Sequence, residues 1–182
     1  VYEIDPNRIF TDKGRRNTLR RLNPSLVVDS AEHKETLART VSLAHFILKT
    51  MKAIQAKSWI AAHNNTNGYD GRGTISIKRY QKKLADGAKY LIEVHNAGID
   101  EDDLFFVTEP SDFEIMSKAN WNVVLQNPDV ANDPNEDDGS LSVLAEMRGK
   151  RYINIEAERA DNGFGSDHLK EQKAMVDLTF KI

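Results

Sequence analysis

The chain has 182 residues, 40% of them hydrophobic and 29% charged, which is enough for one globular domain with its own core. Its net charge of -3 leaves no basic stripe for a phosphate backbone, and no apolar run approaches the ~20 residues that cross a bilayer, so we expect neither nucleic acid as a partner nor a membrane span. Without cysteine the chain forms no disulfide and no cysteine-bound zinc site, so any metal must be held by His, Asp or Glu.

The first four residues alternate between apolar and polar side chains and predict the end of a strand that turns at Asp5-Pro6-Asn7-Arg8. The guanidinium of Arg8 can bind a carboxylate with two parallel hydrogen bonds, and Asn7 can donate beside it. An ordinary turn, in which Asp and Asn bond their own backbone, is the alternative. Because the chain enters this pattern without an initiator Met, we expect residues 1–182 to form a single α/β domain whose N-terminal section precedes Val1.

Apolar side chains recur at helical spacing over residues 31–55 and predict the clearest helix, with Asp29 and Glu32 as a capping box. Residues 59–62 then form a short apolar run that ends in His63 and continues as an Asn/Gly-rich loop, a pattern that predicts a buried strand. Open α/β sheets build their sites at such strand ends. His63 is therefore a candidate metal ligand, and a histidine that only caps the strand is the alternative.

The second half of the chain predicts strands at residues 90–94, 104–108, 121–125 and 152–158, and helices at residues 111–118, at 140–148 and from 167 onward. Residues 75–84 fit either a strand or a short helix. His168 and Glu171 could chelate a metal at i and i+3, but a charged terminal helix favours a solvated face. The alternation of strands and helices predicts an α/β fold, with a mixed, mainly parallel sheet and helices on both faces.

Polar groups follow three of the predicted strands: Arg8, His63, and Glu156 with Glu158. In a mainly parallel sheet these ends meet at one edge. A guanidinium, an imidazole and a carboxylate there are the parts of a metal-assisted hydrolysis site, as substrate clamp, metal ligand and general base.

The segment Ile4-Asp5-Pro6-Asn7-Arg8-Ile9-Phe10 resembles the Asp-Leu-Asn-Arg-x-Phe motif of the succinylglutamate desuccinylase and aspartoacylase group, which shares the zinc carboxypeptidase fold. The resemblance implies that Asn7 and Arg8 bind the substrate carboxylate. Ala62-His63-Asn64 is similar to the stretch that holds the third zinc ligand of the group, a histidine.

The strand at residues 152–158 is similar to the one that carries the catalytic glutamate of that group, and Asn162-Gly163-Phe164-Gly165 resembles its glycine-containing continuation. The resemblance assigns Glu156 as the catalytic base, with Glu158 as the alternative if a bulge shifts the strand. The chain departs from the group in lacking an upstream His-x-x-Glu pair of zinc ligands, which we expect before Val1.

Taken with these residues, the resemblance implies a Zn²⁺-dependent hydrolase that cuts an amide or peptide bond next to a free carboxylate. Its partner would be a small molecule or peptide that carries that carboxylate. Two alternatives stay open: a non-catalytic binding domain of the same fold, and a zinc amidase that acts on cell-wall peptides.

Overall fold

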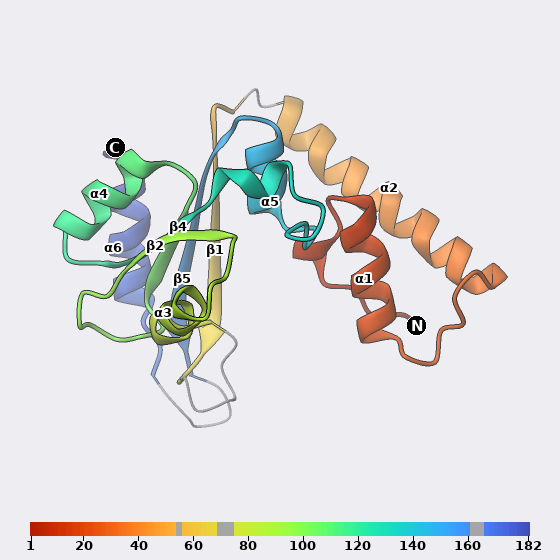
Figure 1. The fold of residues 1–182 in the computed structure, drawn as a ribbon, viewed down its shortest axis with the longest axis horizontal. Coiled ribbons are helices and arrows are strands. Elements are labelled where there is room, and N and C mark those ends of the chain that lie inside the picture. The colour runs from red at the N-terminus through yellow and green to blue at the C-terminus, as the bar shows by residue number, and fades with distance from the viewer. Residues whose placement is uncertain (54–55, 69–74, 161–165) are drawn as a thin grey trace. The chain divides into compact units, whose positions relative to one another are not determined.

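The computed structural model describes residues 1–53, 56–68, 75–160 and 166–182, and the side chains of 51–53 are outside that description (Figure 1). The chain divides into two compact units. The first consists of residues 1–57 and 129–150, and the second of residues 58–128 and 151–182. Each unit is therefore built from two separate stretches of the sequence.

The first unit is helical, and each of its α-helices begins at a hydroxyl side chain. Its elements are η1 (Pro6–Arg8), α1 (Asp12–Leu22), α2 (Ala31–Ala53) and α5 (Leu141–Met147), and η2 (Pro128–Ala131) begins one residue before its second stretch. Thr11 caps α1, Ser30 caps α2 and Ser140 caps α5 by accepting a backbone N–H of the first turn. The predicted long helix is confirmed, but Ser30 caps it instead of Asp29, whose φ of 65° lies in the left-handed region.

The predicted strand at the N-terminus is wrong, because side chains bind the backbone there in place of a neighbouring strand. Asn23 accepts from Glu3 N at 2.9 Å and donates to Glu3 O at 2.7 Å. Asp5 then caps η1 by accepting from Asn7 N at 3.0 Å, and Pro6 has no N–H to give to a sheet. Four alternating residues were too few to distinguish a strand from this extended lead into a turn.

Two glycines join the two stretches of the first unit. Phe10 N donates to Gly139 O at 3.1 Å, and Thr11 Oγ1 donates to Asp137 Oδ1 at 2.8 Å. A Cβ added to Gly14 would lie 2.2 Å from Gly139 Cα, so the backbones approach more closely than any side chain permits. The φ of Gly139 is 79°, which a residue with a side chain rarely adopts.

The second unit contains a five-stranded sheet in the order β1 (Ser58–Thr66), β5 (Arg151–Arg159), β3 (Leu104–Val107), β4 (Asn122–Gln126) and β2 (Leu91–His95). The pairs β1/β5 and β3/β4 are parallel, and the pairs β5/β3 and β4/β2 are antiparallel. The predicted α/β class and mixed sheet are confirmed. The sheet is evenly mixed and not mainly parallel, because apolar runs predict that a strand is buried but not the direction of its neighbour.

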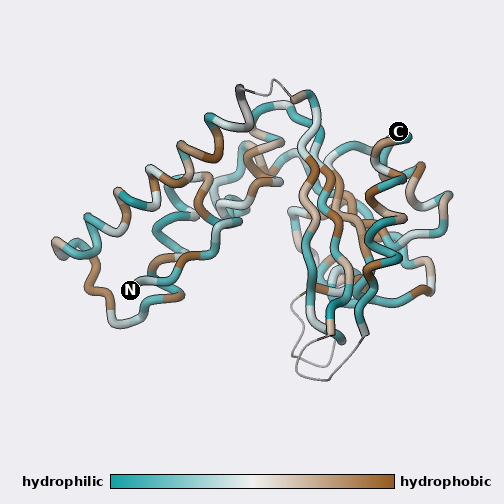
Figure 2. Tube along the Cα trace, turned by 180° about the vertical axis from the view of Figure 1, so that it is seen from behind, coloured by the Kyte–Doolittle hydropathy of each residue, from teal (hydrophilic) through white to brown (hydrophobic). Residues whose placement is uncertain are grey.

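Helices cover both faces of this sheet (Figure 1). On one face, Phe105 packs with Met116 of α4 (Pro110–Lys118) and Met175 of α6 (Leu169–Thr179). On the other, Phe106 packs with Ile77 of α3 (Ile77–Ala85). Figure 2 shows the hydrophobic residues concentrated along the middle of the strands.

The stretch at residues 75–84, which fitted a strand or a helix, is helical. Ser76 accepts from Arg79 N at 3.2 Å and caps α3, which turns its apolar residues toward the sheet. Among the described residues, no helix has the length and apolar character needed to cross a membrane.

Candidate functional site

His63 and Glu156 are in contact on neighbouring strands. In the parallel ladder of β1 and β5, His63 pairs with Glu156, and His63 Nδ1 lies 3.3 Å from Glu156 Oε1. Asn154 Nδ2 donates to the same oxygen at 2.8 Å. The side chain of Glu156 is 7% exposed and that of His63 is 40% exposed, so the imidazole reaches solvent while the carboxylate behind it does not. β1 continues to Thr66, so His63 lies within the strand and not at its end.

Glu158 lies two residues further along β5, so its side chain projects from the same face as that of Glu156. It is buried, and its Oε1 accepts from Asn67 Nδ2 at 2.9 Å and from Ser166 N at 2.7 Å. The register pairs Glu158 with Asn65, whereas Glu156 pairs with His63. Of the two candidate bases, Glu156 is therefore the one that contacts His63.

Asn7 and Arg8 belong to the first unit, whereas His63, Glu156 and Glu158 belong to the second. Arg8 Nε lies 3.3 Å from Asp138 Oδ2, and its Nη1 donates to Asn7 O at 2.7 Å. Asn7 Oδ1 accepts from Leu141 N at 2.9 Å. Both side chains thus bind residues of their own unit, on a 3-10 helix and not at a strand end.

A second group of ionisable side chains gathers where β5 ends and α6 begins. His168 Nδ1 lies 2.8 Å from Asp103 Oδ2, and Asp103 Oδ1 accepts from Glu158 N at 3.0 Å. The ligand atoms of Asp100, Glu158 and His168 all lie within 4.8 Å of one another. Among the residues that the structure describes, this is the one group of three or more that could hold a metal, and it does not include His63.

Burial changes the protonation of this group. Burial, together with the neighbouring carboxylates of Asp100, Glu101 and Glu158, raises the pKa of Asp102 to about 6, against one hydrogen bond from Gly68 N that lowers it. Burial also raises the pKa of Asp103, which the Glu158 amide and His168 partly offset. Burial alone would lower the pKa of His168, but the Asp103 carboxylate raises it above its ordinary value.

No family model, curated protein or solved structure matches this chain.

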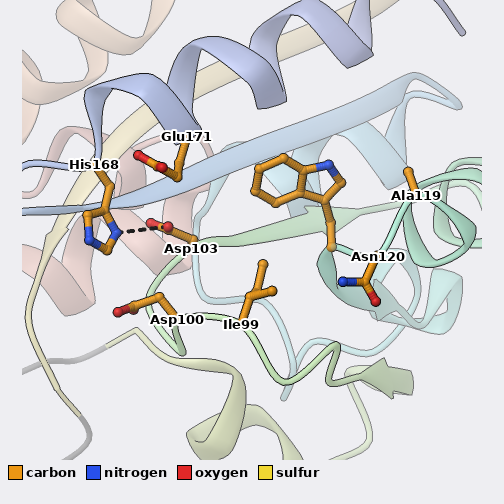
Figure 3. Close-up of a pocket in the computed structure, with 8 residues that line it drawn as sticks. Ile99, Asp100, Asp103, Ala119, Asn120, His168 and Glu171 are labelled. Carbon is orange, nitrogen blue, oxygen red and sulfur yellow. Dashed lines mark hydrogen bonds and ion pairs between the residues drawn. The ribbon is translucent and has the colours of Figure 1, made fainter.

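A pocket of about 580 Å³ opens beside the second group. Figure 3 shows Asp100, Asp103, His168 and Glu171 at one end of the pocket, with Ala119 and Asn120 at the other. A ligand in the pocket would thus meet three carboxyl groups and an imidazole.

His168 and Glu171 correct the expectation of a solvated face on the last helix. The side chain of His168 is 18% exposed and is paired with Asp103, and both residues line the pocket. The i and i+3 spacing drew attention to His168, but the other members of its candidate metal group are Asp100 and Glu158 and not Glu171. Asp100 and Asp103 lie in an acidic stretch of the sequence that predicts a loop. Only the fold brings them close to His168.

Two sequence features of the proposed site lie outside the described residues. They are the glycines of the loop after β1, within residues 69–74, and the segment Asn162-Gly163-Phe164-Gly165.

Proposed function

We propose that the chain is a hydrolase that cuts an amide or peptide bond next to a free carboxylate, with Glu156 as the general base. The contact of 3.3 Å between His63 Nδ1 and Glu156 Oε1 supports this proposal. A general base must be held in one orientation within reach of the proton that it removes. Hydrogen bonds from Asn154 and from the His63 imidazole hold the Glu156 carboxylate in this way. The imidazole is exposed, so a substrate can approach Glu156 from the side of His63.

The resemblance to zinc carboxypeptidases implies zinc, which when bound supplies a Lewis acid and a water with a pKa of about 7. A catalytic zinc site takes three protein ligands. His63 is part of no group of three ligand residues among the residues described. These residues by themselves do not fit zinc at His63, so the proposed role of Glu156 does not depend on the metal.

The incomplete ligand set at His63 supports a second candidate, a non-catalytic domain that binds a carboxylate ligand. A panel of N-acyl amino acids and short peptides with free carboxylates separates the two. Hydrolysis of any member by the purified chain supports the enzyme, and binding without hydrolysis supports the binding domain.

Replacing the proposed base tests the mechanism on whichever substrate is turned over. Glu156→Gln keeps the shape of the side chain but cannot take a proton, so kcat falls by ~10²–10⁴-fold with KM nearly unchanged. Glu93→Gln, an exposed position on β2 of the same sheet, makes the same charge change and keeps full activity. If Glu156→Gln is fully active and Glu158→Gln is not, Glu158 is the base. If both are fully active, the mechanism is wrong.

A further inference from the structure

We propose that Asp100, Glu158 and His168 bind a divalent transition-metal ion at the end of the pocket beside β5. Their ligand atoms lie within 4.8 Å of one another. Bonds of ~2.0–2.2 Å at tetrahedral angles place two ligands of one metal about 3.4 Å apart, so the group needs to close by up to roughly 1.4 Å. His63 is not a ligand of this site, and the site does not rest on the proposed hydrolase activity.

The buried carboxylate of Glu158 points to a ligand independently of the clustering. Glu158 is 1% exposed, and Asn67 and Ser166 both donate to Oε1. Oε2 accepts no hydrogen bond from the described residues, and its neighbour, His168 Nε2, is 3.9 Å away. Oε2 of this buried side chain therefore faces His168 without a hydrogen bond, and a cation placed between Oε2 and Nε2 would bind both atoms.

His168 is oriented as metal-binding histidines are. Asp103 is 2% exposed and accepts the Nδ1 proton at 2.8 Å, an assignment that leaves the lone pair of Nε2 on the side of Glu158. Ser166 Oγ lies 2.9 Å from Nε2 and would give up this contact when a metal binds. Asp103 is a positioning residue in this arrangement and not a ligand.

The ligand set selects the class of metal. One imidazole with two carboxylates suits Zn²⁺ or Mn²⁺, whereas Ca²⁺ and Mg²⁺ prefer oxygen ligands alone. Three carboxylates, those of Asp100, Asp103 and Glu158, lie near the single imidazole of His168, so acidic groups outnumber basic ones at the site. Asp100 and His168 line the pocket, so the remaining coordination positions of the metal would face it (Figure 3).

Calorimetric titration of the chelator-treated chain with Zn²⁺ and with Mn²⁺ tests the site. We expect one equivalent to bind to the wild type, and weaker binding by at least 100-fold in His168→Gln and Glu158→Gln. Asp103→Asn leaves the three ligands in place but removes the carboxylate that orients His168. Losing such an orienting group typically costs ~10–100-fold in metal affinity. Glu171→Gln removes a charge from the same pocket without removing a ligand, and His63→Ala removes an imidazole elsewhere on the sheet, so both keep wild-type affinity.

Variants at buried positions could lose metal binding because they do not fold, so each is compared with the wild type by circular dichroism before titration. Asp100→Asn, at an exposed ligand, serves as the variant that folds in any case and still weakens binding. Absence of binding to the wild type overturns the proposal, as does equal affinity in the wild type and Asp100→Asn. Metal that is lost in His63→Ala but retained in His168→Gln overturns this site and supports zinc at His63.

Discussion

The side chain of Asn122 holds the loop before β3 against β4 with three hydrogen bonds. It is fully buried, donates to Asp100 O at 2.6 Å and to Asp103 O at 3.0 Å, and accepts from Ala97 N at 2.9 Å. Asn122→Ala leaves these backbone groups without their hydrogen-bond partner. Each buried polar group left unpaired typically costs ~1–3 kcal/mol of stability. We expect the free energy of unfolding, measured with urea, to fall by about 2–5 kcal/mol.

The exposed Asn96 of the same loop provides the control. Its amide also forms hydrogen bonds, to Gln81 and Gly98, but water can replace them. Asn96→Ala therefore costs less than about 1 kcal/mol. Equal losses in the two variants would show that Asn122 contributes no more than a surface amide.

At the scale of single residues, part of the candidate sites could be predicted from the sequence. His63 and Glu156 could be placed on strands because apolar residues precede them, and the register then makes them neighbours. However, β1 is an edge strand in which only Trp59 and Asn65 are buried. The group around His168 could not be found in this way. Asp103 and His168 are 65 positions apart, and their contact depends on which strand lies next to β5.

At the scale of elements, a buried ion pair attaches α4 to β5. Asp112, in the first turn of α4, accepts two hydrogen bonds of 2.8 Å from Arg151, and their side chains are 4% and 24% exposed. Removing one partner of a buried pair costs ~3–5 kcal/mol, and the partial exposure of Arg151 reduces this. We expect Asp112→Asn to destabilise the chain by about 1–3 kcal/mol in urea denaturation.

Glu114 on the same helix provides the control, because it shows how much an exposed ion pair contributes to stability. It pairs with Lys118 at i and i+4, and both side chains are exposed. Such pairs contribute ~0.3–0.5 kcal/mol, so Glu114→Gln has little effect. A comparable loss in Asp112→Asn and Glu114→Gln would contradict the attachment of α4 through Arg151.

Most elements followed from the sequence where burial was continuous or periodic, as in α2 and β3, because hydrophobic spacing is a direct consequence of one buried face. Two cases did not. The basic stretch of α3 buries only one narrow face, at Ile77, Tyr80 and Leu84, so its pattern was weak. The antiparallel pairing of β5 with β3 joins distant stretches of the chain, and no local pattern encodes it.

At the scale of the whole molecule, the first unit depends on a contact between its two stretches. In Gly14→Ala the new methyl would meet the backbone of Gly139 at 2.2 Å and Arg8 O at 2.7 Å, and neither can move without opening the unit. We expect hydrogen exchange to accelerate at amides of residues 1–57 and 129–150, with protection of the sheet amides unchanged.

Gly87→Ala is the control for this prediction. Gly87 also has a positive φ, of 85°, but a Cβ there meets no atom within 4 Å. The substitution therefore adds backbone strain of about 1 kcal/mol without a collision. Equal protection in Gly14→Ala and the wild type would rule out the glycine contact as the link between the two stretches.

The pairing of β1 with β5 has a consequence for how the chain is made. Their partners His63 and Glu156 are 93 residues apart, and β1 lies at the end of the strand order, where β5 is its neighbour. At ~5–20 residues per second, a ribosome needs roughly 5–20 s to complete β5 after β1 has been synthesised. During that interval the nascent chain carries Trp59 and the apolar residues after it without their strand partner. This is the stretch that a chaperone would have to shield until β5 has been synthesised.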